Sequence, residues 1–319
     1  MEVTVLKFKA RAKETLRINK HAGSTIRGSL GNGLYNYFCK NKNEDCENCH
    51  IKETCVYFEL FNPIITQSEF ERFNNYSKRF KKKPRGYIIQ AIKPLGEKLI
   101  YKRGEEFEFK INLVGNAKEC YPFLLKAFEE SKGIGPKNCQ FEIVEVWEEG
   151  LEGSQKIYSL NKFNLPSKTI TLKEMKEKAK EYLRFRDKIK IIFKTPTHIT
   201  INSEFVQKLD FYKIMRATFR RISMLSLFYN EEKINVDAKF DKYLEDSKEV
   251  KATTTKLDYD EWNRYSNRQD KEIKMKGMTG EIHFELKEEI EKYLPYLLML
   301  EHINLGNDTV FGLGNVEIK

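Results

Sequence analysis

Both halves of this chain show the same succession of strands and helices, which restricts the folds open to it. In the first half, hydrophobic periodicity predicts a strand, a helix, two strands, a helix and a strand, at 3–10, 24–38, 87–92, 106–113, 121–130 and 140–146. The second half repeats this order at 188–194, 211–229, 252–259, 279–286, 287–302 and a C-terminal strand. A repeated βαββαβ order predicts an α+β protein of two tandem ferredoxin-like (RRM-like) domains, each an antiparallel sheet with helices on one face.

Glycines follow the second helix of each half, as Gly133 and Gly135 in the first and Gly312 and Gly314 in the second. Glycine has no Cβ, so it reaches positive φ and leaves its amide unshielded, and several such N–H groups can converge on an anion. The glycine-rich loop 306–314 is therefore predicted to approach a phosphate backbone; the alternative is an ordinary tight turn. Its predicted RNA contacts are Gly306, Gly312, Leu313 and Gly314.

A polar stretch rich in Gly and Glu, at 148–155, is the expected domain boundary. It predicts an N-terminal domain at 1–152, which carries a Cys-rich insertion at 39–57, and a C-terminal domain at 153–319, which carries the glycine-rich loop.

The chain is basic, with 57 Lys and Arg against 47 Asp and Glu and a formal net charge of +10. Such a balance suits a polyanionic partner such as nucleic acid, although it also serves solubility. The apolar runs are short and interrupted by charge, and the N-terminus reads as a strand, so we expect no signal peptide or membrane span and a cytoplasmic location.

Four of the six cysteines fall within seventeen residues, and the central pair forms a CxxC motif. This spacing suits tetrahedral thiolate ligation, and clustered cysteines in a reducing compartment more often bind metal than form disulfides. The alternative is free thiols in a polar loop. A metal held by four protein ligands would be structural, so the sequence predicts a structural zinc on Cys39, Cys46, Cys49 and Cys55.

Several segments, taken in their order and spacing, carry a resemblance to one family. They are Ala22-Gly23-Ser24-Thr25-Ile26-Arg27-Gly28, the Cys cluster ending in Cys55-Val56-Tyr57-Phe58-Glu59-Leu60-Phe61-Asn62-Pro63, Asn112-Leu113-Val114-Gly115, Thr195-Pro196, Arg220-Arg221 and Phe311-Gly312-Leu313-Gly314. The pattern resembles the long, Cys-containing branch of the CRISPR precursor-RNA-processing endoribonucleases of the RAMP superfamily, the Cas six family. It covers nearly the whole chain.

The resemblance implies a metal-independent ribonuclease of antiviral defence that cuts CRISPR repeat RNA (pre-crRNA). Attack by the 2′-hydroxyl would leave a 2′,3′-cyclic phosphate and a 5′-hydroxyl, and the guide RNA would pass to a CRISPR interference complex. No catalytic cofactor is implied.

Such a reaction needs a base, an acid and a positive group near the phosphorane, and histidine suits the proton transfers. His21 is the first candidate because the family's catalytic histidine lies in or near the first helix; the rival is His302, which ends the last predicted helix. Lys20 is expected to stabilise negative charge, and Tyr35 is a possible acid.

The chain departs from its relatives at the glycine-rich loop. Relatives of this branch often carry a His two residues before the glycine that matches Gly306 and a Lys just after it, whereas this chain has Asn304 and Asn307. Either catalysis rests on His21 or this protein cleaves weakly.

Basic residues on helices and in a Lys/Arg run are expected to contact phosphates, as a stripe of cations mixed with aromatics does in RNA-binding proteins. The alternative for each is a solvated surface charge. The expected contacts are Arg27, Lys82, Lys83, Arg85, Arg216, Arg220 and Arg221.

Two other functions stay open. A non-catalytic RAMP subunit that grips crRNA in an effector complex would share the fold, the loop and the basic surface. A zinc-bearing interaction module unrelated to RNA would share only the Cys cluster.

Overall fold

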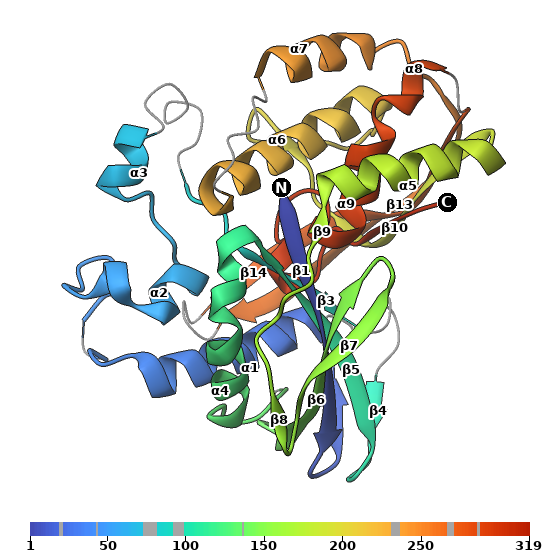
Figure 1. Cartoon of the computed structure of the whole chain (residues 1–319). Helices are drawn as coiled ribbons and strands as arrows, with labels where there is room; N and C mark the ends of the chain where they lie inside the picture. The colour runs from blue at the N-terminus through green and yellow to red at the C-terminus, as the bar shows by residue number, and fades with distance from the viewer. Residues whose placement is uncertain are drawn as a thin grey trace. The chain divides into compact units, whose positions relative to one another are not determined.

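The computed structural model describes residues 1–18, 22–42, 44–72, 82–91, 99–135, 137–230, 237–266, 271–285 and 288–319 (Figure 1). The chain divides into two compact units. Unit 1 comprises Met1–Ile170 and Ser223–Ile234, and unit 2 comprises Thr171–Ile222 and Asn235–Lys319.

The sheet of unit 1 has the strand order of a ferredoxin-like fold. Its strands run in the order β3-β5-β1-β6-β7-β8, so the four strands of the βαββαβ motif lie in the order 2-3-1-4 with antiparallel neighbours. Their bounds are β1 Glu2–Ala12, β3 Tyr87–Ala91, β5 Glu106–Val114, β6 Phe141–Gly150, β7 Gly153–Ser159 and β8 Lys162–Phe163. The short strands β2 (Leu16–Ile18) and β4 (Leu99–Tyr101) pair separately, and β9 is Ile170–Thr171.

Two helices pack on this sheet, α1 (Ala22–Phe38) and α4 (Tyr121–Glu129). Phe128 of α4 contacts the paired rings of Phe8 and Phe109, whose centroids lie 5.2 Å apart. Gly33 is required where α1 meets α4, because a Cβ there would lie 1.7 Å from the Ala127 carbonyl oxygen. The remaining helical segments are η1 Lys52–Thr54, α2 Val56–Phe61, α3 Gln67–Arg72 and η2 Gly115–Cys120.

Unit 2 repeats the arrangement, with strand order β13-β14-β10-β15 and again the pattern 2-3-1-4. These strands are β10 Lys188–Thr197, β13 Ala252–Ser266, β14 Lys271–Glu285 and β15 Val316–Ile318, and a small hairpin joins β11 Thr200–Ile201 to β12 Glu204–Phe205. Phe211 packs against Phe284 and Tyr293 in its core. The helices are α5 Leu172–Phe185, α6 Phe211–Tyr229, α7 Asp237–Asp246, α8 Glu288–Glu291 and α9 Leu294–Ile303, with η3 at Thr309–Phe311; the residues of α6 from Ser223 onward belong to unit 1.

The tandem ferredoxin-like prediction is confirmed, with differences in detail. The helix expected at 287–302 is two helices, because Pro295 lacks the N–H that a continuous helix needs and instead stands in the first turn of α9. The additional helix α5 precedes the second motif.

The domain boundary differs from the expected 152/153. The stretch 148–155 is the β6–β7 hairpin, paired through Gly150 and Gly153, and unit 1 continues to Ile170. The reason is Glu148, whose fully buried carboxylate accepts hydrogen bonds from the backbone N–H groups of Ser167 and Lys168. This glutamate therefore holds the following segment to the unit 1 sheet.

None of the helices that the structure describes combines the length and apolarity needed to cross a bilayer.

Candidate functional site

The glycine-rich loop of unit 2 is closed by its own backbone hydrogen bonds. The Leu305 N–H donates to the Gly314 carbonyl at 2.7 Å, and the Gly314 N–H donates to the Pro196 carbonyl at 3.0 Å. The side chain of Asn304, which is fully buried, donates to the Leu313 carbonyl at 2.9 Å. Asn304 thus performs a structural role at the helix end.

Glycine is required at two positions of this loop because neighbouring backbone atoms approach closely there. Gly306 has a φ of 85°, and a Cβ there would lie 2.4 Å from the His198 carbonyl oxygen. Gly314 has a φ of 71°, and its Cβ would lie 1.9 Å from the Leu305 carbonyl oxygen. Glycine is needed at both positions for internal packing, whatever the loop binds.

The accessible parts of the loop are 306–308 and the half-buried Phe311. Gly306 and Asp308 are half-buried and Asn307 is exposed, whereas Gly312, Leu313 and Gly314 are buried. Among the residues that the structure describes, the backbone N–H groups of Gly306 and Asp308 have no hydrogen-bond partner. A phosphate group would therefore meet the loop at this edge, and the buried Leu313 side chain belongs to the core instead.

Arg221 is an internal brace, which corrects its expected role as an RNA contact. Its Nε donates to the Ile303 carbonyl at 2.7 Å, and its Nη2 donates to Thr309 Oγ1 at 2.8 Å. Burial lowers the pKa of this guanidinium to about 9. The arginine ties α6 to the end of α9 and to the start of η3, so both its Nε and its Nη2 bond within unit 2.

Its two predicted companions on α6 are more accessible. Arg220 is exposed. Arg216 is half-buried and contacts Tyr212 Oη at 3.2 Å and Asn202 Oδ1 at 3.5 Å. These two remain available to a polyanion on the surface of unit 2.

In unit 1, three predicted RNA contacts have internal partners. The side chain of Lys83 is 8% exposed and lies 3.0 Å and 3.1 Å from the carboxylates of Glu59 and Glu69. Arg27 stacks on the Phe61 ring at 4.5 Å, and the Arg85 Nε donates to the Phe61 carbonyl at 2.9 Å. The exposed member of the set is Lys82.

The predicted catalytic residues are spread over both units. His21 and Lys20 lie outside the described residues. Tyr35, in unit 1, donates its hydroxyl to the Lys42 carbonyl at 3.0 Å, and burial, followed by nearby Cys39 and Cys46, raises its pKa. Both observations disfavour Tyr35 as an acid at neutral pH.

His302 lies in the last turn of α9 and is half-buried, and its Nε2 is enclosed by protein. His198, to which the sequence analysis gave no role, borders the glycine-rich loop instead. Its carbonyl accepts from the Asn307 N–H at 2.8 Å, and its Nδ1 lies 3.8 Å from Asp308 Oδ2.

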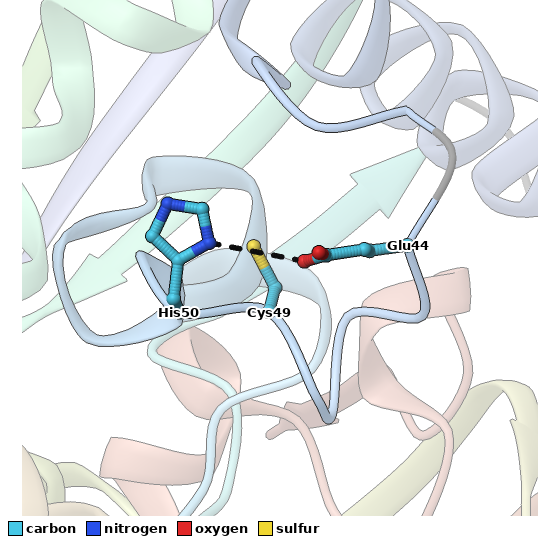
Figure 2. Close-up of side chains that lie close together, drawn as sticks. All are labelled: Glu44, Cys49 and His50. Atoms are coloured by element: carbon cyan, nitrogen blue, oxygen red, sulfur yellow. Dashed lines mark ion pairs between the residues drawn. The ribbon is translucent and has the colours of Figure 1, made fainter.

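The Cys-rich insertion of unit 1 gathers its four cysteines around one cavity. All four predicted ligands are half-buried cysteines that line it. Among the described residues, however, the group whose ligand atoms all lie within 4.8 Å of one another is Glu44, Cys49 and His50 (Figure 2). His50 Nδ1 lies 3.9 Å from Glu44 Oε2, and the His50 side chain is 75% exposed.

The donor chemistry of this cavity fits zinc, because soft thiolates are the usual ligands of structural zinc. For all four sulfurs to bind one zinc ion, the thiols must move closer together than they lie in this structure. The two remaining cysteines stand apart, as expected: Cys139 is buried, and burial raises the pKa of Cys120 to about 11.

Two protein-family models match this chain. Residues 1–170 match a model described as an N-terminal domain, and residues 191–316 match the model of the CRISPR-associated endoribonuclease Cas6. Residues 191–316 are thus similar to the Cas6 endoribonucleases, and the tandem ferredoxin-like units are a fold that solved Cas6 structures share.

Solved structures share the fold at low sequence identity. A Thermus thermophilus Cas6 aligns over 99% of this chain and 98% of its own, with 11% identity and a TM-score of 0.54. A Cas6 product complex aligns over 100% of both chains, with 12% identity and a TM-score of 0.53.

A longer chain, in a partial Cas6-RT-Cas1–Cas2 complex, aligns with all of this chain at 12% identity and a TM-score of 0.58. This protein spans 46% of that chain and 29% of the chain in the corresponding Cas6-RT-Cas1–Cas2 complex. No curated protein sequence matches this one.

Proposed function

We propose that this protein is a cytoplasmic endoribonuclease that cleaves CRISPR repeat RNA to give guide RNA. The observation that carries the proposal is the Cas6-family match over 191–316, the segment that holds the glycine-rich loop. The net charge of +10 and the open amide edge at 306–308 support an RNA substrate. In this proposal the guide RNA then passes to a CRISPR interference complex.

In the proposed mechanism the substrate's own 2′-hydroxyl attacks the adjacent phosphate, so no metal is needed. His21 is the proposed proton-transfer group and Lys20 the proposed cation near the phosphorane. His21 is preferred because the family's catalytic histidine lies in or near the first helix, and the enclosed Nε2 of His302 supports this choice over its rival.

The proposal is tested with full-length protein and a synthetic repeat RNA from the host array, in EDTA. After the cut is mapped, the same RNA is made with one 2′-deoxy nucleotide on the 5′ side of that bond. We expect the all-ribose RNA to be cut to a 2′,3′-cyclic phosphate and a 5′-hydroxyl, and the substituted RNA to stay whole. Cleavage of the substituted RNA, or cleavage that EDTA abolishes, would contradict this mechanism.

The same assay assigns the histidine. We expect His21→Ala to lower the single-turnover rate by at least ~100-fold with little change in affinity, the usual scale for loss of a general acid or base. His302→Ala, with its thermal melting checked, is the control and should retain cleavage. The reverse result would transfer the role to His302.

One observation favours the alternative of a non-catalytic RAMP subunit that binds crRNA. The positions at which relatives often carry His and Lys hold Asn304, which is committed to the Leu313 carbonyl, and Asn307, which is bonded to Thr200. RNA that is bound tightly but survives intact would support this alternative.

We also propose that the Cys-rich insertion carries a structural zinc on Cys39, Cys46, Cys49 and Cys55. The cavity shared by all four residues supports this set. Zinc would contribute folding energy to a polar loop and no step of the reaction.

A further inference from the structure

An aromatic row lies beside the glycine-rich loop in unit 2, formed by His198, Phe205 and Tyr259. The ring centroids of His198 and Phe205 are 5.2 Å apart, and those of Phe205 and Tyr259 are 5.6 Å apart. The interplanar angles are 61° and 60°, so each ring meets the next at an angle. The three rings thus form one continuous aromatic row.

The His198 end of the row is fixed to the accessible edge of the loop. The Asn307 N–H donates to the His198 carbonyl at 2.8 Å, and Asp308 Oδ2 lies 3.8 Å from His198 Nδ1. A ribose-phosphate chain that met the amides of Gly306 and Asp308 would therefore pass beside the aromatic row.

The middle of the row is held by the β11–β12 hairpin, which presents Phe205. The two central residues of its turn, Asn202 and Ser203, have φ values of 53° and 69°, as a two-residue type I′ turn requires. The hairpin is also bonded to the glycine-rich loop, since Asn307 Nδ2 donates to Thr200 Oγ1 at 3.1 Å. Phe205 is thus placed by a short hairpin that is bonded to the glycine-rich loop through the Thr200 and Asn307 side chains.

The far end of the row is open. The Tyr259 residue is 54% exposed on β13, in contrast to aromatic residues such as Phe193, Phe211 and Phe219, which are fully buried in unit 2. The Tyr259 hydroxyl donates to Glu261 at 2.8 Å, which fixes the orientation of the ring.

Charge near the row is mixed, with cations beside Phe205 and the hairpin turn. Lys276 Nζ lies 4.8 Å from the centroid of Phe205, and Arg216 reaches Asn202 in the hairpin turn. The Glu261 carboxylate is paired with Lys274, and Asp308 faces His198, while Asp258 and Asp260 flank Tyr259 in the sequence.

We propose that the aromatic row is a nucleobase-stacking site for single-stranded RNA, with Tyr259 as its exposed platform. Every nucleobase has a π-face, and an aromatic ring beside a cation binds bases with little sequence preference. Lys276 is the cation for the adjoining phosphate. The proposal rests on the proposed function for its substrate class.

The test uses full-length protein and two fluorescein-labelled probes, a twelve-nucleotide oligouridylate and a ribose-phosphate chain of equal length without bases. We expect Tyr259→Ala to weaken binding of the oligouridylate by about tenfold and to leave the abasic chain unaffected, because stacking needs the base. Tyr259→Phe keeps the ring and should bind like the wild type. Phe185→Ala removes an 84% exposed ring elsewhere in unit 2 and is the matched control.

Equal losses with both probes, or a Tyr259→Ala variant that binds the oligouridylate as tightly as the wild type, would overturn the stacking site. If a saturating concentration of the Tyr259→Ala variant then cleaved repeat RNA at the normal rate, the proposed function would stand. Wild-type protein that stacks bases but leaves repeat RNA whole would overturn the proposed function and leave the stacking site standing.

Discussion

Arg220 and Arg221 are neighbours in α6, yet their surroundings separate their roles. Arg220 is exposed, while both ends of the Arg221 guanidinium are bonded to Ile303 and Thr309. Lys82 and Lys83 differ in the same way, because Lys83 is enclosed between Glu59 and Glu69. In each of these pairs of adjacent residues with equal charge, one side chain lies on the surface and the other is held by internal contacts.

We expect Arg221→Gln to reduce the free energy of unfolding by about 2 kcal/mol, since buried acceptors lose charged donors. Arg220→Gln should change it by no more than about 0.5 kcal/mol, the usual range for exposed positions. Urea unfolding followed by circular dichroism measures both. A fully stable Arg221→Gln variant with weakened RNA binding would restore the surface role expected from the sequence.

Candidate residues were thus identified from the sequence by type, and the structure sorted them by partner. Arg216, Arg220 and Lys82 keep an accessible position, whereas Arg27, Lys83, Arg85 and Arg221 have internal contacts. The sequence showed no signal for His198, Phe205 and Tyr259, because the Phe205–Tyr259 contact joins segments far apart in the chain and the His198–Phe205 contact depends on a hairpin. The Asn202-Ser203 pair was the one local hint, as residues of this type favour tight hairpin turns.

At the scale of elements, two connections carry the features that distinguish this protein. The glycine-rich loop connects α9 to β15 and is closed by backbone bonds on both sides. The Cys-rich insertion connects α1 to α2, and its outer residues are polar, so a metal would supply the order that apolar packing does not.

We expect purified wild-type protein to contain about one zinc ion per chain, measured by inductively coupled plasma mass spectrometry. Cys46→Ser should lose most of it, together with the thiolate-to-metal absorption of the cobalt-substituted protein. Cys120→Ser, a half-buried cysteine outside the cluster, is the matched control and should retain the metal.

Glu44→Gln and His50→Gln distinguish the second ligand set. Both should keep the zinc if the four thiolates hold it. Loss of metal in these two variants, with retention in Cys46→Ser, would place the ion on Glu44, Cys49 and His50.

At the scale of the whole molecule, the excess of positive charge sets how RNA affinity responds to salt. A net charge of +10 is distributed over both units, and many of the lysines are paired with Glu or Asp. The number of phosphates neutralised is therefore smaller than the count of basic residues.

The logarithm of the RNA association constant should fall linearly with the logarithm of salt concentration. For single strands each neutralised phosphate contributes about 0.7 to the slope, so Lys82→Gln should lower the slope by about 0.7 if Lys82 makes one phosphate contact. Lys83→Gln should leave the slope unchanged, because its charge is already paired. Filter binding over a salt series measures this, and an unchanged slope in Lys82→Gln would remove that residue from the interface.

The order of elements was determined by the sequence alone, because hydrophobic periodicity and turn residues act within a few residues of each other. For the same reason the tandem ferredoxin-like fold and the cysteine cluster could be read locally. Tertiary structure alone decided that Glu148 holds the first unit together to Ile170, that Arg221 is a brace and that three distant rings meet beside the glycine-rich loop. Burial and hydrogen-bond partners depend on which segments the fold brings together, and no local pattern of residues records them.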